Sequence, residues 1–300
     1  MISVDGDHHL GELLKLLALE QLEVNLFRGP SRDIGTPRVF GGQVLAQAVL
    51  AASRTIEERR LHSLHAYFLR AGDPEAPIVY DVDRSRDGRS FSARRVVAIQ
   101  HGRQIFTMAA SFQLPQEGLE HQFPAPEVPP PETLAPSREI SEQQLRDAPQ
   151  KLRRWINRFG PFEFRPVQQR DPAHPEPTPP RQQLWFRLDG NPGDDAVLHR
   201  ALLAYVSDFY LIGTATLPHG LSYLDGHLVM ASLDHAMWFH RDVRVDDWLL
   251  YDCDSPSACG SRGLARGMIY DRQGRLVANT AQEGMIRVIE PDGAERVETS

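Results

Sequence analysis

The chain has 300 residues, of which 41% are hydrophobic and 24% are charged, and its formal net charge at pH 7 is -7. This composition is typical of a globular protein, either with two domains of ordinary size or with two fused halves. A net negative charge gives no overall attraction to nucleic acid or to an anionic membrane surface, so we expect neither as a partner.

Sorting signals and cysteine usage favour a cytoplasmic protein. The chain opens without a basic and then apolar signal peptide, and it has no run of about 18 apolar residues that could span a bilayer. Its last residues, Val-Glu-Thr-Ser300, do not match a peroxisomal address. Two cysteines, Cys253 and Cys259, are too few for a disulfide framework. We therefore expect reduced thiols and no stable membrane insertion.

The first half of the chain predicts a strand and a buried helix, followed by an antiparallel meander. Residues 10–17 have helical apolar spacing, and residues 24–29 form a strand candidate that ends at glycine and proline. Gly41 and Gly42 precede an alanine- and leucine-rich helix at 44–53, where they would allow close approach of another backbone. That helix is apolar nearly all round, which predicts burial on most sides. Four further strands are expected at 61–69, 78–84, 91–100 and 104–113.

The same order of elements is predicted again after a proline-rich stretch at 114–140, which has the composition of an extended linker. A second helix is expected at 195–212, with Asp194 or Asp195 as its N-terminal cap. A second proline-rich insertion lies at 172–180. The strands of this half are predicted at 162–166, 184–188, 228–240, 248–254, 260–270 and 276–288.

Three short matches in the same order indicate that the two halves are copies of one unit. The matching pairs are 65–70 with 235–241, 80–83 with 251–254, and 101–111 with 273–283. The first pair aligns His65 with His235, and a position repeated in both halves is expected to serve the shared scaffold. We therefore predict an N-terminal repeat at 1–115, a proline-rich linker at 116–150 and a C-terminal repeat at 151–300.

Five segments, spread over both halves, carry a resemblance to a known family. They are Val39-Phe-Gly-Gly-Gln43, Ser63-Leu-His-Ala-Tyr-Phe-Leu-Arg70, Arg86-Asp-Gly-Arg-Ser-Phe-Ser-Ala-Arg-Arg95, Leu233-Asp-His-Ala-Met-Trp-Phe-His240 and Ala281-Gln-Glu-Gly284. As a set they closely resemble the TesB-type acyl-CoA thioesterase II family. The resemblance implies an α+β double hot-dog fold, in which two fused repeats each wrap an antiparallel sheet around a long central helix. It also implies hydrolysis of fatty acyl-CoA to free fatty acid and coenzyme A, with no cofactor.

The resemblance further implies a triad of Asp, Thr or Ser, and Gln that holds the hydrolytic water. By position within matching motifs, these residues fall on Asp208, Ser232 and Gln282. Asp208 would act as general base, while the other two would fix the direction of the water by hydrogen bonds. Ala110 takes the place of Gln282 in the first half, which is therefore expected to be catalytically blank and to form one wall of the acyl tunnel.

Coenzyme A carries phosphates, so arginines on or beside the loops of the meander are candidates for binding it. The group comprises Arg86, Arg89, Arg94, Arg95, Arg262 and Arg266. A solvated charged rim is an equally good interpretation of any single member. Because a fused pair still exposes sheet edges and helix faces, we also expect a homo-oligomer, either a dimer or a tetramer.

Two other functions remain open from the sequence. A hot-dog enoyl-CoA hydratase or dehydratase would pair its aspartate with a histidine five residues later, whereas Gly213 stands five residues after Asp208. A non-catalytic acyl-CoA-binding module would bind the ligand without turnover. A metal site is not expected, because the histidines of the second half lack the close spacing of a ligand pair on one helix face. These histidines are His219, His227, His235 and His240.

Overall fold

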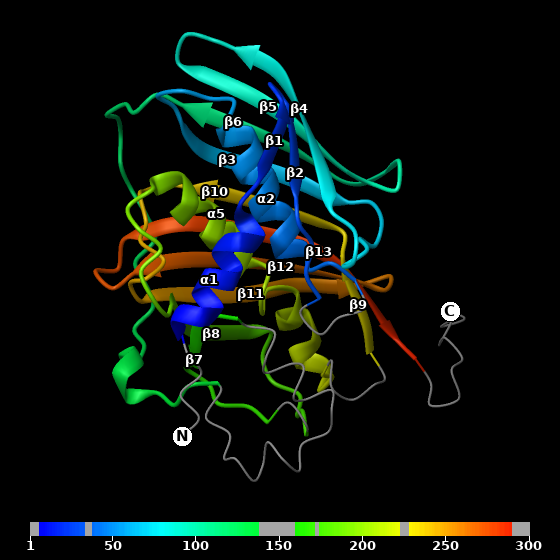
Figure 1. Cartoon of the computed structure of the whole chain (residues 1–300). Helices are drawn as coiled ribbons and strands as arrows, with labels where there is room; N and C mark the ends of the chain where they lie inside the picture. Colours follow the sequence, from blue (N-terminus) through cyan, green and yellow to red (C-terminus); the bar gives the residue numbers. More distant parts are fainter. Residues whose placement is uncertain (1–5, 34–37, 138–159, 172–173, 223–227, 290–300) are drawn as a thin grey trace.

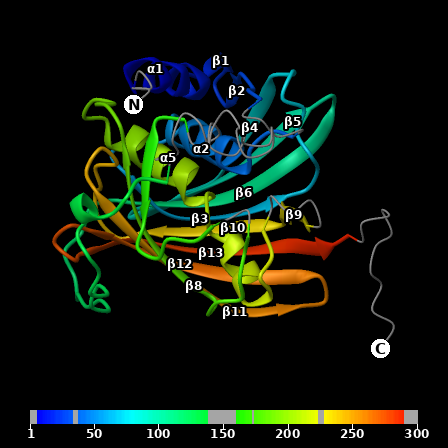
Figure 2. The same ribbon diagram turned by 90° about the horizontal axis from the view of Figure 1, so that it is seen from below.

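The chain forms one antiparallel sheet with its central helices packed on one face. The computed structural model describes residues 6–33, 38–137, 160–171, 174–222 and 228–289. Within these residues, thirteen strands join in a single sheet, in the order β1-β2-β4-β5-β6-β3-β10-β13-β12-β11-β8-β7, with β9 paired to β13. The strands of the two halves lie one set above the other, with α2 and α5 side by side in front of them (Figure 1). In the view from below, α1 lies outside α2, on the side away from the sheet (Figure 2).

Each half contributes one buried helix and its own run of strands, which is the predicted double hot-dog arrangement. The first half contains α1 (Gly6–Leu17), β1 (Glu20–Glu23), β2 (Leu26–Gly29), α2 (Gly41–Ser53), β3 (Arg60–Phe68), β4 (Ile78–Asp87), β5 (Phe91–Gln100) and β6 (Arg103–Gln113). The second half contains β7 (Phe162–Pro166), β8 (Arg181–Leu188), α5 (Ala196–Ser207), η2 (Ile212–His219), β9 (Leu228–Ser232), β10 (Asp234–Phe239), β11 (Leu249–Cys259), β12 (Arg262–Asp271) and β13 (Leu276–Val288). A short 3-10 helix, η1 (Pro131–Thr133), lies between them.

Repeated hydrogen bonds fix which residues of the two halves are equivalent. The backbone N–H groups of Leu69 and Arg70 both donate to Ile105 O, and those of His240 and Arg241 both donate to Val277 O. The guanidinium of Arg70 donates to Gln104 O, as that of Arg241 does to Leu276 O. Arg70 is therefore the structural counterpart of Arg241, and the strands β3 and β10 can be matched residue by residue from that point.

The matched strands correct the alignment of His65 with His235. Counting back from Arg70 and Arg241 places Leu64 at the position of His235, and His65 at that of Ala236. His235 is fully buried against the helices, whereas His65 is exposed and packs edge-on against Trp238 with ring centroids 5.2 Å apart. The predicted match was wrong by one residue, and a shift of one residue moves a strand side chain to the opposite face. His235 is therefore not a repeated scaffold position.

The second central helix is shorter than predicted. Asp195 caps α5 through a bond from Val197 N–H to its carboxylate, 2.8 Å long, and the helix ends with Asp208 as its C-cap. The chain then turns through Tyr210, whose φ is 66°, and continues as the 3-10 helix η2. By length and composition alone, the stretch Ala196–His219 could cross a membrane, contrary to the expectation from the sequence, but 72% of its most apolar window is buried inside the protein. It is a core segment in this fold.

The proline-rich stretch packs against the second half over its described part. Trp185 Nε1 donates to Pro129 O at 3.0 Å, and the Gln122 amide bonds both Gly274 O and Leu276 N–H. Apart from η1, the described residues of this stretch form no helix or strand, as an extended linker would. Residues 138–150 of the predicted linker lie outside the described part of the chain.

Close approach of the two central helices requires the predicted glycine pair. A Cβ atom added at Gly42 would overlap Tyr205 O in α5, and one added at Gly41 would lie 2.7 Å from Asp208 Oδ2. Such positions are far inside van der Waals contact, and a backbone oxygen in the last turn of a helix cannot swing away as a side chain can. The glycines therefore let the N-terminus of α2 lie directly against the C-terminus of α5.

Replacing Gly42 by alanine is expected to lower the free energy of unfolding by about 3 kcal/mol, because overpacked backbone contacts cannot relax. The measurement is urea denaturation of the variant and of the unmodified protein. Gly11→Ala in α1 is the matched control, since a Cβ there meets nothing within 4 Å. That control should be neutral or stabilising by up to about 1 kcal/mol. Equal stability of the two variants would contradict the packing argument.

Candidate active site

The C-terminus of α5 presents a buried carboxylate to residues from two neighbouring strands. Asp208 has a side chain that is only 5% exposed. Its Oδ1 accepts a hydrogen bond of 2.6 Å from Gln282 Nε2 in β13 and a longer one, 3.4 Å, from Ser232 Oγ at the end of β9. The structure thus brings together the three residues that the family resemblance singled out, although they lie far apart in the sequence.

The orientation of Gln282 follows from its neighbours. Its Nε2 donates to Asp208 Oδ1 and also to Ser232 Oγ, at 3.0 Å. Reversing the amide would direct its oxygen at a carboxylate oxygen, so only the donating orientation is compatible with an ionised Asp208. Both amide hydrogens of Gln282 are then engaged, and the side chain is fully buried. Gln282 therefore acts as a fixed support behind the two other polar groups.

The first half also contributes directly to this site. Asp208 Oδ2 accepts a hydrogen bond of 2.9 Å from Gly42 N–H, in the first turn of α2. The first N–H groups of a helix have no partner within the helix and carry the positive end of its dipole, so they favour a negative charge nearby. The first half was predicted to contribute no catalytic side chain. Its backbone nevertheless forms part of the site, through Gly42 N–H.

A second polar side chain, His235, lies behind Asp208. Its Nε2 is 3.0 Å from Ser207 Oγ, and its Nδ1 is 3.9 Å from Asp208 Oδ1. Complete burial lowers the pKa of His235 below its ordinary value, and the negative charge of Asp208 opposes that shift only in part. The imidazole is therefore neutral at pH 7. The sequence predicts a shared scaffold role for His235 and not its place beside Asp208, because that contact depends on which face of the strand the side chain occupies.

Asp234, next to His235, points away from Asp208 and has a structural role. Its Oδ1 accepts a bond of 2.6 Å from Glu283 N–H, at the irregular step between β9 and β10. Burial is the main cause that raises the pKa of this carboxyl group. The neighbouring pair of Asp234 and His235 is therefore not an acid and base pair in the structure.

A large cavity opens in front of the buried carboxylate. It encloses about 1310 Å³ and is lined by residues of both halves, with Asp208 and Ser232 among them. The first half supplies an apolar wall that includes Val39, Phe40 and Phe68. Small-molecule sites commonly enclose about 300 to 1,000 Å³, so this cavity has room for a long ligand.

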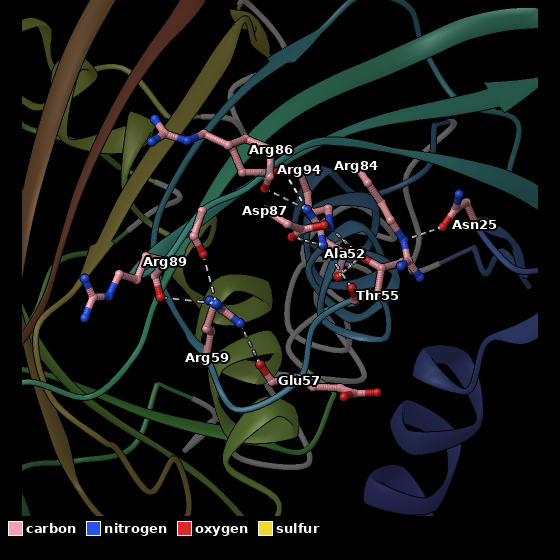
Figure 3. A network of polar contacts seen from close by, with 12 residues as sticks. Asn25, Ala52, Thr55, Glu57, Arg59, Arg84, Arg86, Asp87, Arg89 and Arg94 are labelled. Carbon is pink, nitrogen blue, oxygen red and sulfur yellow. Dashed lines mark hydrogen bonds and ion pairs between the residues drawn. The ribbon is translucent and has the colours of Figure 1, made fainter.

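None of the six arginines predicted to bind phosphates lines this cavity. Arg94 is buried, with hydrogen bonds to Thr55, Asp87 and the backbone. The guanidinium groups of Arg86 and Arg89 point away from Arg94 (Figure 3). In the second half, Arg262 pairs with Glu283 and Arg266 with Asp254. Arg95 is exposed on β5. The arginines that do line the cavity are Arg38, Arg70 and Arg170.

The buried Arg94 explains why the first half has no second copy of the site. Arg94 lies opposite Ala110 across β5 and β6, at the place where Ala265 lies opposite Gln282 across β12 and β13. Its guanidinium bonds Thr55, next to the C-cap of α2. In one half a glutamine reaches the end of the central helix, and in the other half an arginine from the neighbouring strand does so.

The described residues contain no group of three or more His, Cys, Asp or Glu side chains that could hold a metal ion. His227, one of the four histidines considered above, lies outside the described part of the chain. Cys253 and Cys259 are both free thiols, the first buried and the second exposed.

Comparison with known proteins gives a consistent picture. The profile of the acyl-CoA thioesterase family matches residues 161–285, and that of the acyl-CoA thioesterase N-terminal domain matches residues 27–113. Human acyl-coenzyme A thioesterase 8 is 44% identical over 295 residues, covering 94% of this chain and 91% of that protein. Acyl-CoA thioesterase 2 of Haemophilus influenzae is 42% identical over 282 residues, covering 94% of this chain and 99% of that protein.

Solved structures agree with these relatives. The acyl-CoA thioesterase II TesB2 of Mycobacterium marinum superposes with a TM-score of 0.76 at 41% identity, over 93% of this chain and 98% of that one. A hot-dog protein of Alicyclobacillus acidocaldarius has a TM-score of 0.75 at 20% identity, over 92% of this chain and 98% of that one, which supports the fold alone. The chain belongs to the acyl-CoA thioesterase family, with the double hot-dog fold.

Proposed function

We propose that the chain hydrolyses fatty acyl-CoA by direct attack of a water molecule that Asp208 deprotonates. The observation that carries this proposal is the buried carboxylate at the cavity wall, held by Gln282 at 2.6 Å and by Gly42 N–H at 2.9 Å. Of the triad, only a carboxylate readily accepts a proton at neutral pH. Ser232 and Gln282 fix its position, and Ser232, which lines the cavity, also directs the water.

The reaction needs a place for negative charge as well as a base. When the water oxygen attacks the thioester carbon, the carbonyl oxygen becomes negatively charged. The first turn of α2 begins at Gly41, which lines the cavity, and the N–H of Gly41 and the helix dipole suit that charge, since Gly42 N–H already donates to Asp208. Gln282 is not needed as an additional donor, because both of its amide hydrogens are engaged. No covalent acyl-enzyme intermediate is required.

A hydratase or dehydratase is less well supported by the same geometry. Gly213, five residues after Asp208, lines the cavity and carries no side chain that could act as an acid or base. The histidine that does lie near Asp208 is His235, which is fully buried behind it and is absent from the cavity lining. A proton donor for a hydration reaction would have to reach the substrate, and this imidazole does not.

Asp208→Asn is expected to lower kcat at least about 100-fold, because the amide keeps the shape of the side chain but cannot take the proton. The measurement is release of free thiol from a medium- or long-chain acyl-CoA, with melting temperature as the control for folding. Acyl-CoA binding without any thiol release by the unmodified protein, at every chain length tried, would favour a binding module. Hydration of an enoyl-CoA would favour the hydratase instead.

We predict that kcat depends on the hydroxyl group of residue 232 and depends less on the size of that side chain. Ser232→Ala should lower kcat about 10-fold, because Gln282 Nε2 and the water each lose a hydrogen-bond partner. Ser232→Thr keeps the hydroxyl and should stay within about 3-fold of the unmodified protein. Steady-state thiol release by both variants checks this. Similar losses in the two variants would point to packing rather than hydrogen bonding.

We also propose that Arg38 and Arg170, on the rim of the cavity, attract the phosphates of coenzyme A. Arg38 is exposed and Arg170 is half-buried, so both lie where a nucleotide would remain near solvent. Arg70 also lines the cavity, but its guanidinium repeats the bond that Arg241 makes in the other half, which favours a structural role. A guanidinium fork is well suited to phosphate oxygens.

Arg38→Ala and Arg170→Ala should each raise KM for acyl-CoA about 5- to 10-fold, since a charged hydrogen bond is lost at a partly exposed site. KM for the acyl thioester of N-acetylcysteamine, which has no phosphates, should not change. Arg262→Ala is the matched control, because Arg262 pairs with Glu283 away from the cavity lining. An unchanged KM for acyl-CoA in both rim variants would contradict the assignment.

The cytoplasmic location and the dimer or tetramer expected from the sequence stay predictions. Size-exclusion chromatography with light scattering would measure the mass of the assembly.

A further inference from the structure

The two halves differ in polarity at four equivalent or matched places around the ends of their central helices. The second half has Ser232, His235 and Gln282 on its strands, where the first half has Leu61, Leu64 and Ala110. The C-caps of the two helices are Asp208 and Arg54. A residue needed only for the shared scaffold would be expected in both copies. His235 therefore belongs with the polar residues that distinguish the catalytic half.

The hydrogen bonds of Ser207 fix the tautomer of His235. The Ser207 hydroxyl donates its single hydrogen to Ala204 O, at 2.9 Å, inside the last turn of α5. It can therefore only accept from the imidazole, so His235 Nε2 carries the hydrogen in their 3.0 Å contact. In the neutral ring, Nδ1 then has a free lone pair. This atom is buried and has no hydrogen-bond partner among the described residues.

That lone pair faces the proposed base, at 3.9 Å from Asp208 Oδ1. Two acceptors cannot bond each other while the aspartate is ionised, which agrees with a separation longer than a hydrogen bond. Once the carboxyl group carries a proton, it becomes a donor, and Nδ1 can accept from it. The arrangement is unfavourable to the resting carboxylate and favourable to the protonated state formed during the reaction.

We propose that His235 is a positioning residue that accepts a hydrogen bond from Asp208 while Asp208 holds the proton taken from water. The inference rests on the proposed function and assigns a further residue to the same site. Water adds to the thioester carbon and its proton goes to Asp208. The carbon–sulfur bond then breaks, and the thiolate of coenzyme A takes that proton as it leaves. The proton passes from water to Asp208 and from Asp208 to the thiolate and never moves to His235, so the imidazole is neutral at every step.

The other groups packed around His235 do not compete for this role. Asp234 is bonded to Glu283 N–H, on the far side from Asp208. The Tyr251 hydroxyl bonds Ser207 O and Thr280 Oγ1, and burial raises the pKa of Tyr251, so it stays neutral. Asp208 is the charged group that acts on the pKa of His235, among the residues the structure describes.

Two substitutions of His235 each preserve the contact of one ring nitrogen and remove the contact of the other. In His235→Asn, the side-chain oxygen can accept near the place of Nδ1, but nothing reaches Ser207. In His235→Gln, the amide reaches the place of Nε2 and can donate to Ser207, but it leaves no acceptor beside Asp208. His235→Leu copies the residue of the first half, Leu64, and removes both contacts. A purely structural role predicts that Gln substitutes better than Asn, and the proposed role predicts the reverse.

The test is kcat and KM for acyl-CoA thiol release by the three variants, at a temperature where melting curves show each to be folded. We expect His235→Asn to keep kcat within about 3-fold, and His235→Gln and His235→Leu to lose about 10- to 100-fold in kcat with little change in KM. Should the Leu variant fail to fold, the comparison of Asn with Gln still decides. Equal activity in Asn and Gln, equal loss in both, or better activity in Gln would overturn the proposal.

The tautomer can be read without turnover, which separates this inference from the proposed function. Nitrogen-15 NMR of labelled histidine should place the hydrogen of His235 on Nε2 at pH 7. A hydrogen on Nδ1, or a charged ring, would overturn the proposal even in an active hydrolase. If the protein released no thiol from any acyl-CoA, the proposed function would fail whichever tautomer the spectrum gave.

Discussion

The site depends on the close contact between the N-terminus of α2 and the C-terminus of α5. This contact exists only because Gly41 and Gly42 have no side chains, since a Cβ at either position would overlap Asp208 or the backbone of α5. It places the positive end of one helix dipole against a carboxylate that ends the other helix. Both halves thus hold the carboxylate that we propose as the base, and neither repeat could form the site alone.

The two repeats use one scaffold for different purposes. The hydrogen bonds at the ends of the central strands recur in both halves, down to the guanidinium groups of Arg70 and Arg241. Around the ends of the central helices, however, a few residues differ in polarity between the two repeats. Gln282 supports a carboxylate in the second half, whereas Arg94 fills the corresponding interior of the first half. The first half is then free to supply the apolar wall of the cavity and the backbone amides of α2.

Much of the fold could be predicted from sequence because its signals are local. Alternating strands, an apolar helix and a glycine pair each show within a short window, and the family resemblance named Asp208, Ser232 and Gln282. The end of α5 and the position of His235 beside Asp208 could not be found in this way. A one-residue shift decides which face of β10 the histidine occupies, and only hydrogen bonds between strands fix that register. The prediction that six arginines bind the phosphates of coenzyme A failed for a similar reason, because their ion-pair partners lie on other elements.

The central claim is that water attacks the thioester directly, with Asp208 as base and never as nucleophile. The most direct measurement is a single turnover of acyl-CoA by excess enzyme in water labelled with oxygen-18, followed by mass spectrometry of the fatty acid. Direct attack predicts one labelled oxygen in the released acid and none in the protein. An unlabelled acid, with the label found in Asp208, would show that the carboxylate attacks first and would contradict the account.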